Sequence, residues 1–231
     1  MKINLMFKVK WTEYISFFVI LVVGIYSLYI SRTDLAYFDK VLSAQNGLLE
    51  WFTFVGLCLI SFGYFYRRKV LAKFRDRKFL IMLSTQGVFY VICALEEVSW
   101  GQRVFGWHSP EMFRDINSVL LETNFQNWLI ARGVSHESWN LSLRVILFIY
   151  LFAVPFSYCK VEKAKQFIDK FALPVPKATH ILSFMILLVI TLYIPSENKV
   201  QFAEFCLTWV LTALTLEPFN RSMFSRRSLV R

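Results

Sequence analysis

The feature that most constrains the fold is a series of six apolar segments separated by polar or charged connections. Each has roughly 16 to 20 residues, which as a helix spans about 24–30 Å, close to the thickness of the hydrocarbon core of a bilayer. Of the 231 residues 56% are hydrophobic, more than the roughly 45–50% of soluble domains. We therefore predict an all-α fold: a polytopic membrane bundle of about six transmembrane helices, forming one domain over residues 1–231. The predicted spans are residues 14–30, 48–66, 79–95, 141–158, 179–194 and 200–216.

Positive charge is concentrated in alternate connections. The N-terminal tail, residues 67–78, residues 160–177 and the C-terminal tail together carry 19 of the 26 lysines and arginines. Because Lys and Arg are retained on the cytoplasmic side, we predict that both termini are cytoplasmic. The net charge of +10 then reflects membrane orientation, and nucleic acid is not an expected partner.

The connection between the third and fourth predicted spans, residues 99–140, is the one long connection on the outer side. Ser109 followed by Pro110 is typical of a helix start, and the apolar residues after them recur at helical spacing. This pattern predicts a short amphipathic helix on the membrane surface. A second short helix is predicted over residues 124–132, ended by Gly133. Ser135 is expected to cap the helix that enters the fourth span.

Acidic, basic and amide side chains gather where this outer connection meets the spans. Such groups are costly near the membrane boundary, so they are expected to pair with one another or to line a wet cavity. The candidates found by position are Glu50, Glu96, Glu97, Gln102, Arg103, Arg144 and Glu204.

Two interpretations of these residues stay open. In one, the glutamates neutralise the two arginines and lock the bundle through charged hydrogen bonds. If the third helix continued to residue 103, Glu96, Trp100 and Arg103 would share a face. In the other, they form a working site, in which Glu96 or Glu97 acts as a general base and Arg103 or Arg144 holds a phosphate.

Sequence patterns of metal, nucleotide and redox sites are absent. The four cysteines lie in or at the ends of apolar segments without C-x-x-C spacing, so neither a disulfide framework nor a thiolate metal site is expected. The three histidines show no H-E-x-x-H spacing, and the chain has no Walker loop, G-x-G-x-x-G or G-x-S-x-G motif. We therefore predict no cofactor and no metal.

One string of residues resembles a known family pattern. The run E-E-V-S-W-G-Q-R at residues 96–103, with F-G-W at 105–107, P-E at 110–111 and E-T-N-F-Q-N at 122–127, is similar to a family of uncharacterised bacterial multi-pass inner-membrane proteins. The resemblance covers roughly residues 35–130. It implies a bacterial inner (cytoplasmic) membrane location and adds Glu122, Asn124 and Asn127 to the binding candidates. Gln126 stands where the family pattern has His, which weakens a metal or acid–base role because an amide cannot shuttle protons.

Three functions are compatible with these features. The first is a non-enzymatic sensor, scaffold or anchor in a larger assembly, with antiviral defence as one setting; the basic inner connections would hold a cytoplasmic protein or membrane lipid, and the chain could form a homo-oligomer. The second is an enzyme acting on a lipid or lipid-linked substrate at the outer leaflet. The third is a transporter or channel. We favour the first.

Overall fold

The computed structural model describes residues 6–111, 123–130 and 132–226. Within these ranges the chain is all-helical, with 77% of residues in helices and no strand, so the predicted fold class is confirmed at this level. The longer helices are α2 (Trp11–Thr33), α4 (Leu48–Leu71), α5 (Arg77–Glu97), α8 (His136–Phe148), α9 (Val154–Lys160), α10 (Glu162–Lys170), α11 (Ala178–Leu192) and α12 (Lys199–Leu216). The short helices are α3 (Leu35–Tyr37), α6 (Gln102–Phe105) and α7 (Phe125–Ile130).

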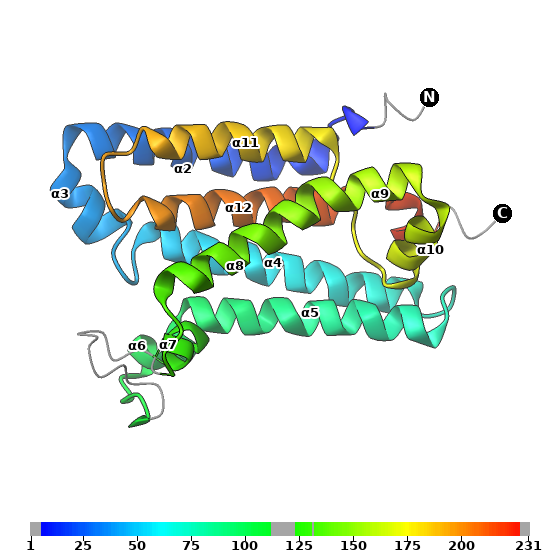
Figure 1. Ribbon diagram of the computed structural model, residues 1–231, viewed down its shortest axis with the longest axis horizontal. Helices are drawn as coiled ribbons and strands as arrows, with labels where there is room; N and C mark the ends of the chain where they lie inside the picture. Colours follow the sequence, from blue (N-terminus) through cyan, green and yellow to red (C-terminus); the bar gives the residue numbers. More distant parts are fainter. Residues whose placement is uncertain (1–5, 112–122, 131, 227–231) are drawn as a thin grey trace.

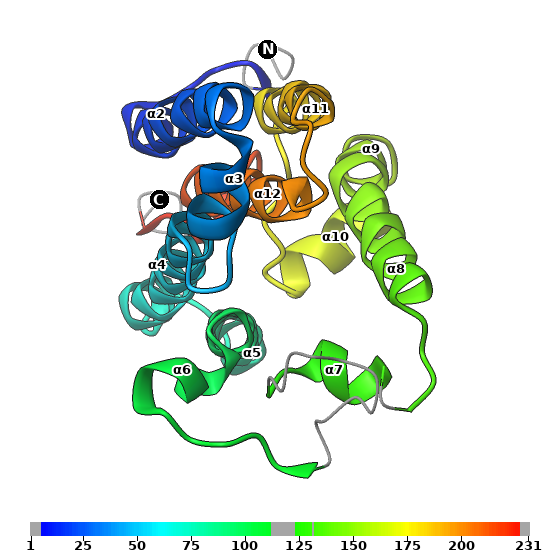
Figure 2. The ribbon, with the colours of Figure 1, turned by 90° about the vertical axis from the view of Figure 1, so that its left-hand side faces the viewer.

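Helix α12 forms the centre of the bundle. It packs against α2, α11 and α4, and α5 packs against α4 (Figures 1 and 2). The helical run α8–α9, joined by the π-helical turn Ile149–Ala153, crosses the bundle obliquely (Figure 1). Phe202, Phe205, Val210 and Leu214 of α12 are all fully buried. The core is therefore built around the last apolar segment of the chain.

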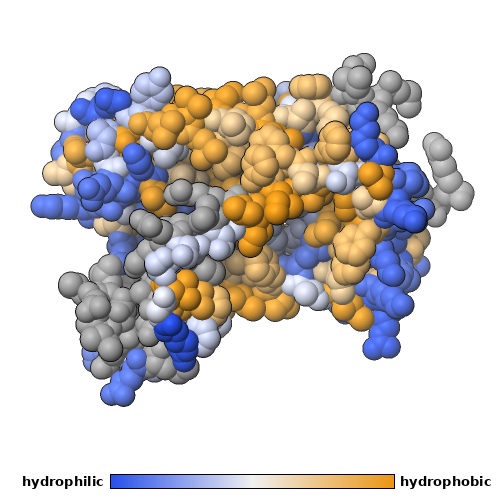
Figure 3. Space-filling view, viewed as in Figure 1, coloured by the Kyte–Doolittle hydropathy of each residue, from blue (hydrophilic) through white to orange (hydrophobic). Residues whose placement is uncertain are grey.

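Three helices of the described chain, α2, α4 and α5, are long and apolar enough to cross a membrane. The segment Val145–Lys160 and helix α11 are apolar but shorter, so the prediction of six spans is confirmed only in part. Large apolar side chains remain exposed on these helices, among them Phe18, Phe62 and Phe89. Figure 3 shows apolar side chains across the middle of the visible face and hydrophilic ones towards both ends, as expected for a membrane protein.

Small and hydroxyl residues allow α4 and α12 to approach closely. A Cβ on Gly56 would lie 2.7 Å from Cγ2 of Thr208. The Trp209 indole donates a hydrogen bond across the interface to the carbonyl of Phe52 at 3.1 Å. Close approach through small residues is a common way for helices to associate in lipid, where there is no hydrophobic force between them.

Part of the connection 160–177 is buried, although its basic composition is typical of an exposed loop. Helix α10 turns back under the bundle, and Ala172 and Val175, which follow it, are fully buried. The Gln86 amide donates to the carbonyls of Phe171 and Ala172 at 3.0 and 3.1 Å. Because Gln86 lies about 14 Å along α5 from its first residue, this connection enters the bundle. The Gln86 amide satisfies two of its backbone carbonyls there, as a buried non-helical segment requires.

Candidate functional site

Three of the predicted acidic residues converge from three different helices. Glu50 lies in the first turn of α4, Glu97 is the last residue of α5 and Glu204 lies in the second turn of α12. The carboxyl group of Glu97 interacts electrostatically with those of Glu204 and Glu50, and Glu204 interacts with Glu50. The structure therefore brings these carboxyl groups together at the end of the bundle that carries the outer connection.

The three glutamates differ in their partners. Glu50 is 9% exposed, and its carboxylate accepts a hydrogen bond from the backbone N–H of Asn46 at 2.6 Å. Glu97 and Glu204 have no hydrogen bond or ion pair to any residue in the described part of the chain. The static lock would pair the glutamates with Arg103 and Arg144, whose side chains lie outside the described part, so it stays a prediction.

The chain reverses direction directly after Glu97. Helix α5 ends there, and Ser99, Trp100 and Gly101 adopt positive φ angles of 46°, 56° and 77°. The condition under which Glu96, Trp100 and Arg103 would share a helical face, one continuous helix to residue 103, is therefore not met. A left-handed conformation costs a non-glycine residue roughly 1–2 kcal/mol, so the surrounding contacts have to hold this turn in place.

Gln102 holds the outer connection together. Its side-chain oxygen accepts hydrogen bonds from the hydroxyl of Ser109 at 3.0 Å and from the backbone N–H of Thr123 at 2.9 Å. The hydroxyls of Ser109 and Thr123 are 2.8 Å apart, and both residues are buried. These contacts brace the loop, and the binding role predicted for Gln102 stays a prediction.

A pocket opens between the left-handed turn and the start of α7. It has a volume of about 550 Å³, and Glu96, Trp100, Trp107, Thr123 and Phe125 line it. The Glu96 carboxylate accepts a hydrogen bond from the Trp100 indole at 2.7 Å and a second one from the backbone N–H of Phe125. We call this the Glu96 pocket.

For several of the remaining predicted site residues, the residue or its side chain lies outside the described part of the chain. Helix α7 (Phe125–Ile130) is shorter than the predicted helix 124–132, and Asn124 precedes it. Ser135 caps α8 as predicted and accepts a hydrogen bond from the N–H of Ser138 at 3.1 Å. Glu122 and the predicted amphipathic helix after residue 111 lie outside the described residues. The backbones of three candidates lie in helices, but their side chains are outside the described part; these are Arg103 in α6, Asn127 in α7 and Arg144 in α8.

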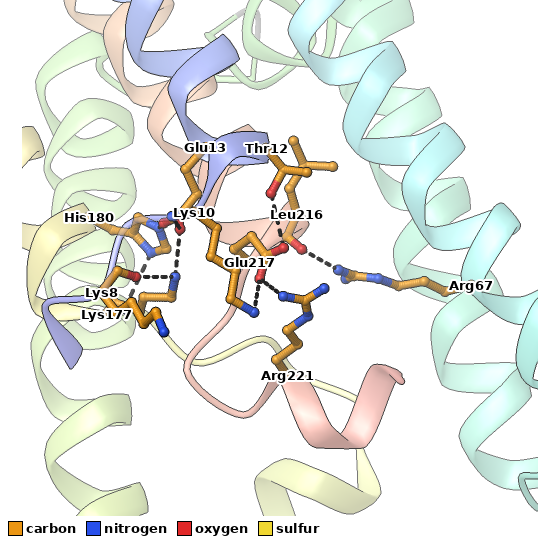
Figure 4. Close-up of polar contacts among 10 residues, drawn as sticks. All are labelled: Lys8, Lys10, Thr12, Glu13, Arg67, Lys177, His180, Leu216, Glu217 and Arg221. Carbon is orange, nitrogen blue, oxygen red and sulfur yellow. Dashed lines mark hydrogen bonds and ion pairs between the residues drawn. The ribbon is translucent and has the colours of Figure 1, made fainter. Parts of the chain in front are cut away.

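The opposite end of the bundle contains a charged network that we did not predict (Figure 4). The Glu13 side chain is fully buried; its carboxylate contacts the Lys177 ammonium and Nε2 of His180, both at 2.7 Å, and accepts from the backbone N–H of Lys10 at 2.8 Å. The N–H of Lys177 donates to Nδ1 of His180 at 3.3 Å, so the imidazole carries its proton on Nε2 and donates it to Glu13. This network ties the start of α2 to the start of α11.

A second buried carboxylate lies beside the first, at the end of α12. Glu217 accepts a hydrogen bond from the Thr12 hydroxyl at 3.0 Å and forms ion pairs with Lys10 at 3.2 Å and Arg221 at 2.7 Å. Burial raises the pKa of Glu217 above its ordinary value, against the lowering effect of the Thr12 hydrogen bond and the nearby cations. The Arg67 guanidinium donates to the carbonyl of Leu216 at 3.1 Å and so caps the C-terminus of α12. Several basic residues at this end are thus structural partners.

Neither end of the bundle has the geometry of a metal centre in its described part. Among the described residues, no group of three or more His, Cys, Asp or Glu side chains lies close enough to hold a metal ion. Comparison of the chain with models of protein families, with curated proteins and with solved structures found no match.

Proposed function

We propose that the chain crosses the bacterial inner membrane six times with both termini in the cytoplasm. One end of the bundle contains the start of α2, the α4–α5 connection with the adjoining helix ends, α10 and the residues that follow α12 (Figure 1). Of the 26 lysines and arginines, 16 lie in residues 6–13, 67–78, 160–177 and 217–226. The positive-inside rule assigns that end to the cytoplasm. The end with Glu50, Glu97 and Glu204 then faces outward. This topology agrees with the resemblance to bacterial multi-pass inner-membrane proteins.

Within this topology the chain acts as a non-enzymatic sensor, scaffold or anchor in a larger assembly, with a ligand-binding site at its outer end. The observation that carries the proposal is the pair Glu97 and Glu204, whose carboxyl groups lie near each other and near Glu50 without a described partner. Ionisable groups at the membrane boundary are expensive to leave unpaired, and those that persist there commonly serve function.

The cytoplasmic end supplies the surface for a partner protein or anionic lipid. Arg67 and Arg75 are held by the carbonyls of Leu216 and Met223. The other basic residues of the stretch 67–78 are exposed: Arg68, Lys69, Lys73, Arg77 and Lys78. Exposed basic residues next to a membrane attract anionic lipid headgroups.

The availability of Glu97 also favours an alternative, an enzyme that acts on a lipid or lipid-linked substrate. A general base needs a carboxylate that can accept a proton, and Glu97 makes no hydrogen bond to a described residue. In this alternative Glu97 would take the proton from a nucleophile bound at the outer leaflet.

The variants Glu97→Gln and Glu204→Gln, alone and together, test the proposal, with Glu111→Gln as a control. Glu111 is exposed on the same connection. We expect all variants to keep the thermal midpoint of the parent protein in mild detergent, and we expect those at Glu97 and Glu204 to lose partners captured by crosslinking in cells. If the set of captured partners is unchanged in the double variant, the assembly role is wrong. If the parent protein turns over a lipid substrate and only the Glu97 variant loses this activity, the result would instead support the enzymatic alternative.

A further inference from the structure

The Glu96 pocket combines two features that recognise the same kind of ligand. One is the carboxylate of Glu96, and the other is the set of aromatic side chains of Trp100, Trp107 and Phe125 that line the pocket with it. Aromatic rings attract cations through their negative faces, and quaternary and primary ammonium groups are the ligands that aromatic cages bind. We propose that the Glu96 pocket binds the ammonium group of an amine or choline-type ligand, an inference that rests on the proposed outer location of this end.

The position of Glu96 is fixed before any ligand arrives. The Trp100 indole and the Phe125 backbone N–H each donate a hydrogen bond to the Glu96 carboxylate. A carboxylate has about four lone-pair positions, so two acceptor positions stay available. Glu96 has no ion pair within the described ranges of the chain. Its negative charge is therefore left for a cation from outside.

The backbone around the pocket explains why these side chains meet. The left-handed turn at Ser99, Trp100 and Gly101 ends α5, and the Trp100 indole donates to Glu96 four residues earlier. The hydrogen bonds of Gln102 with Ser109 and Thr123 then bring the start of α7, with Phe125, to the other side of the pocket. The strained turn thus serves to build a preorganised site.

The same connection already contains a cation on an aromatic ring. The guanidinium of Arg132 lies 3.8 Å from the ring centroid of Trp128, and that ring stacks on Phe125 with centroids 5.4 Å apart. Arg132 also donates to the carbonyl of Trp128 at 3.2 Å and is engaged there. The aromatic side chains of this connection therefore favour cations.

An ammonium group at this position can come from two sources, a lipid headgroup such as phosphatidylethanolamine or a free amine. Both present the same chemistry to Glu96. At the outer end of the bundle, a pocket of about 550 Å³ is open to a lipid headgroup from the bilayer and to a solute from the aqueous side. Separate binding measurements with a free amine and with a lipid distinguish the two sources.

The test uses the full-length protein in nanodiscs. In one arm, choline and ethanolamine are titrated into nanodiscs of phosphatidylglycerol and followed by calorimetry, with sodium chloride as the ionic-strength control. In the other arm, retention of phosphatidylethanolamine against phosphatidylglycerol is measured by native mass spectrometry. Binding in the first arm alone identifies a free amine, and binding in the second arm alone identifies the headgroup.

Two variants and one control assign the binding to this pocket. We expect Glu96→Gln to weaken binding about tenfold or more, because a charge-assisted hydrogen bond is lost. Trp107→Leu should weaken it about threefold while leaving the Glu96 hydrogen bonds in place. Glu111→Gln, which removes the same charge outside the pocket lining, should change it less than about twofold.

No binding in either arm, or equal binding by the parent protein and both pocket variants, would overturn the proposal. Its failure is distinct from that of the proposed assembly role. If ammonium binding is absent while partner capture still depends on Glu97 and Glu204, only the pocket assignment is wrong. If binding depends on Glu96 while partner capture is unchanged in the Glu97 and Glu204 variants, only the assembly role is wrong.

Discussion

The buried charged network around Glu13 offers the sharpest stability prediction. We consider Glu13→Gln, which keeps the size of the side chain but removes its charge. The parent carboxylate is fully buried and contacts Lys177 and His180, each at 2.7 Å, and the Lys177 side chain is only 5% exposed. The variant leaves the Lys177 ammonium buried without its counter-charge. It also puts an amide NH2, which cannot accept a hydrogen bond, in the place of one carboxylate oxygen.

The expected cost follows from these contacts. Removing one partner of a buried ion pair typically costs about 3–5 kcal/mol, because the remaining charge is uncompensated in a low dielectric. His180 moderates the loss only slightly, since its Nε2–H can still donate to the amide oxygen of the new side chain. We therefore expect Glu13→Gln to destabilise the fold by about 3–5 kcal/mol, and Glu13→Gln combined with Lys177→Met to recover part of that loss.

The assay is thermal and denaturant unfolding in mild detergent, with Glu162→Gln as the matched control. Glu162 pairs with Lys165 at 3.2 Å on the surface, where the two side chains are 68% and 39% exposed. Such a pair is worth about 0–1 kcal/mol. If Glu13→Gln costs no more than Glu162→Gln, the buried network does not stabilise the bundle, and the reasoning from burial and contact distance is refuted.

Three further changes follow from the packing. Gly56→Val should destabilise the bundle by about 1–3 kcal/mol, because its Cβ would lie 2.7 Å from Thr208, and unfolding in detergent would measure it. Gly101→Ala should lower the thermal midpoint by several degrees, since its φ is +77° and a Cβ would meet an aromatic ring at 3.0 Å; an unchanged midpoint would contradict the left-handed turn. Gln86→Leu should speed amide exchange in residues 171–177, because two buried carbonyls lose their donor; protection equal to the parent protein would show that this segment does not depend on Gln86.

Much of the fold could be predicted because it is set by local pattern. The apolar segments indicated helices, and every segment that was predicted to span is helical in the described chain. Ser135 marked the start of α8 through its preference for the N-cap position. Helix length and hydropathy, however, support only three spans. An apolar segment can also be a helix that packs inside a bundle, which needs less apolar length than an isolated membrane span. Apolar composition alone therefore overestimates the number of helices that are long and apolar enough to cross a membrane.

The remaining features depend on contacts between distant residues. Glu13 and Lys177 are far apart in the chain, and Lys177 was read as a marker of orientation because nothing near it in sequence reveals its partner. The one signal of this pairing in the sequence was Glu13, a lone acidic residue beside the basic N-terminal tail. Likewise, Gly101 alone hinted at the left-handed turn, because Ser99 and Trp100 adopt positive φ without being glycine. The convergence of Glu50 and Glu97 was predictable from their positions at the same ends of the predicted spans, whereas the hydrogen bond that Glu50 accepts from the N–H of Asn46 was not.

The most direct test of the proposed topology and outward site is the accessibility of two exposed positions to a membrane-impermeant thiol reagent. In a background without the four native cysteines, Lys73→Cys reports on the connection between α4 and α5, and His108→Cys reports on the connection that carries the Glu96 pocket; both residues are exposed. We expect the cysteine at position 108 to be labelled in intact cells and the one at position 73 only after the membrane is permeabilised. Labelling at position 73 but not at position 108 in intact cells would contradict the topology and place the acidic site on the cytoplasmic side.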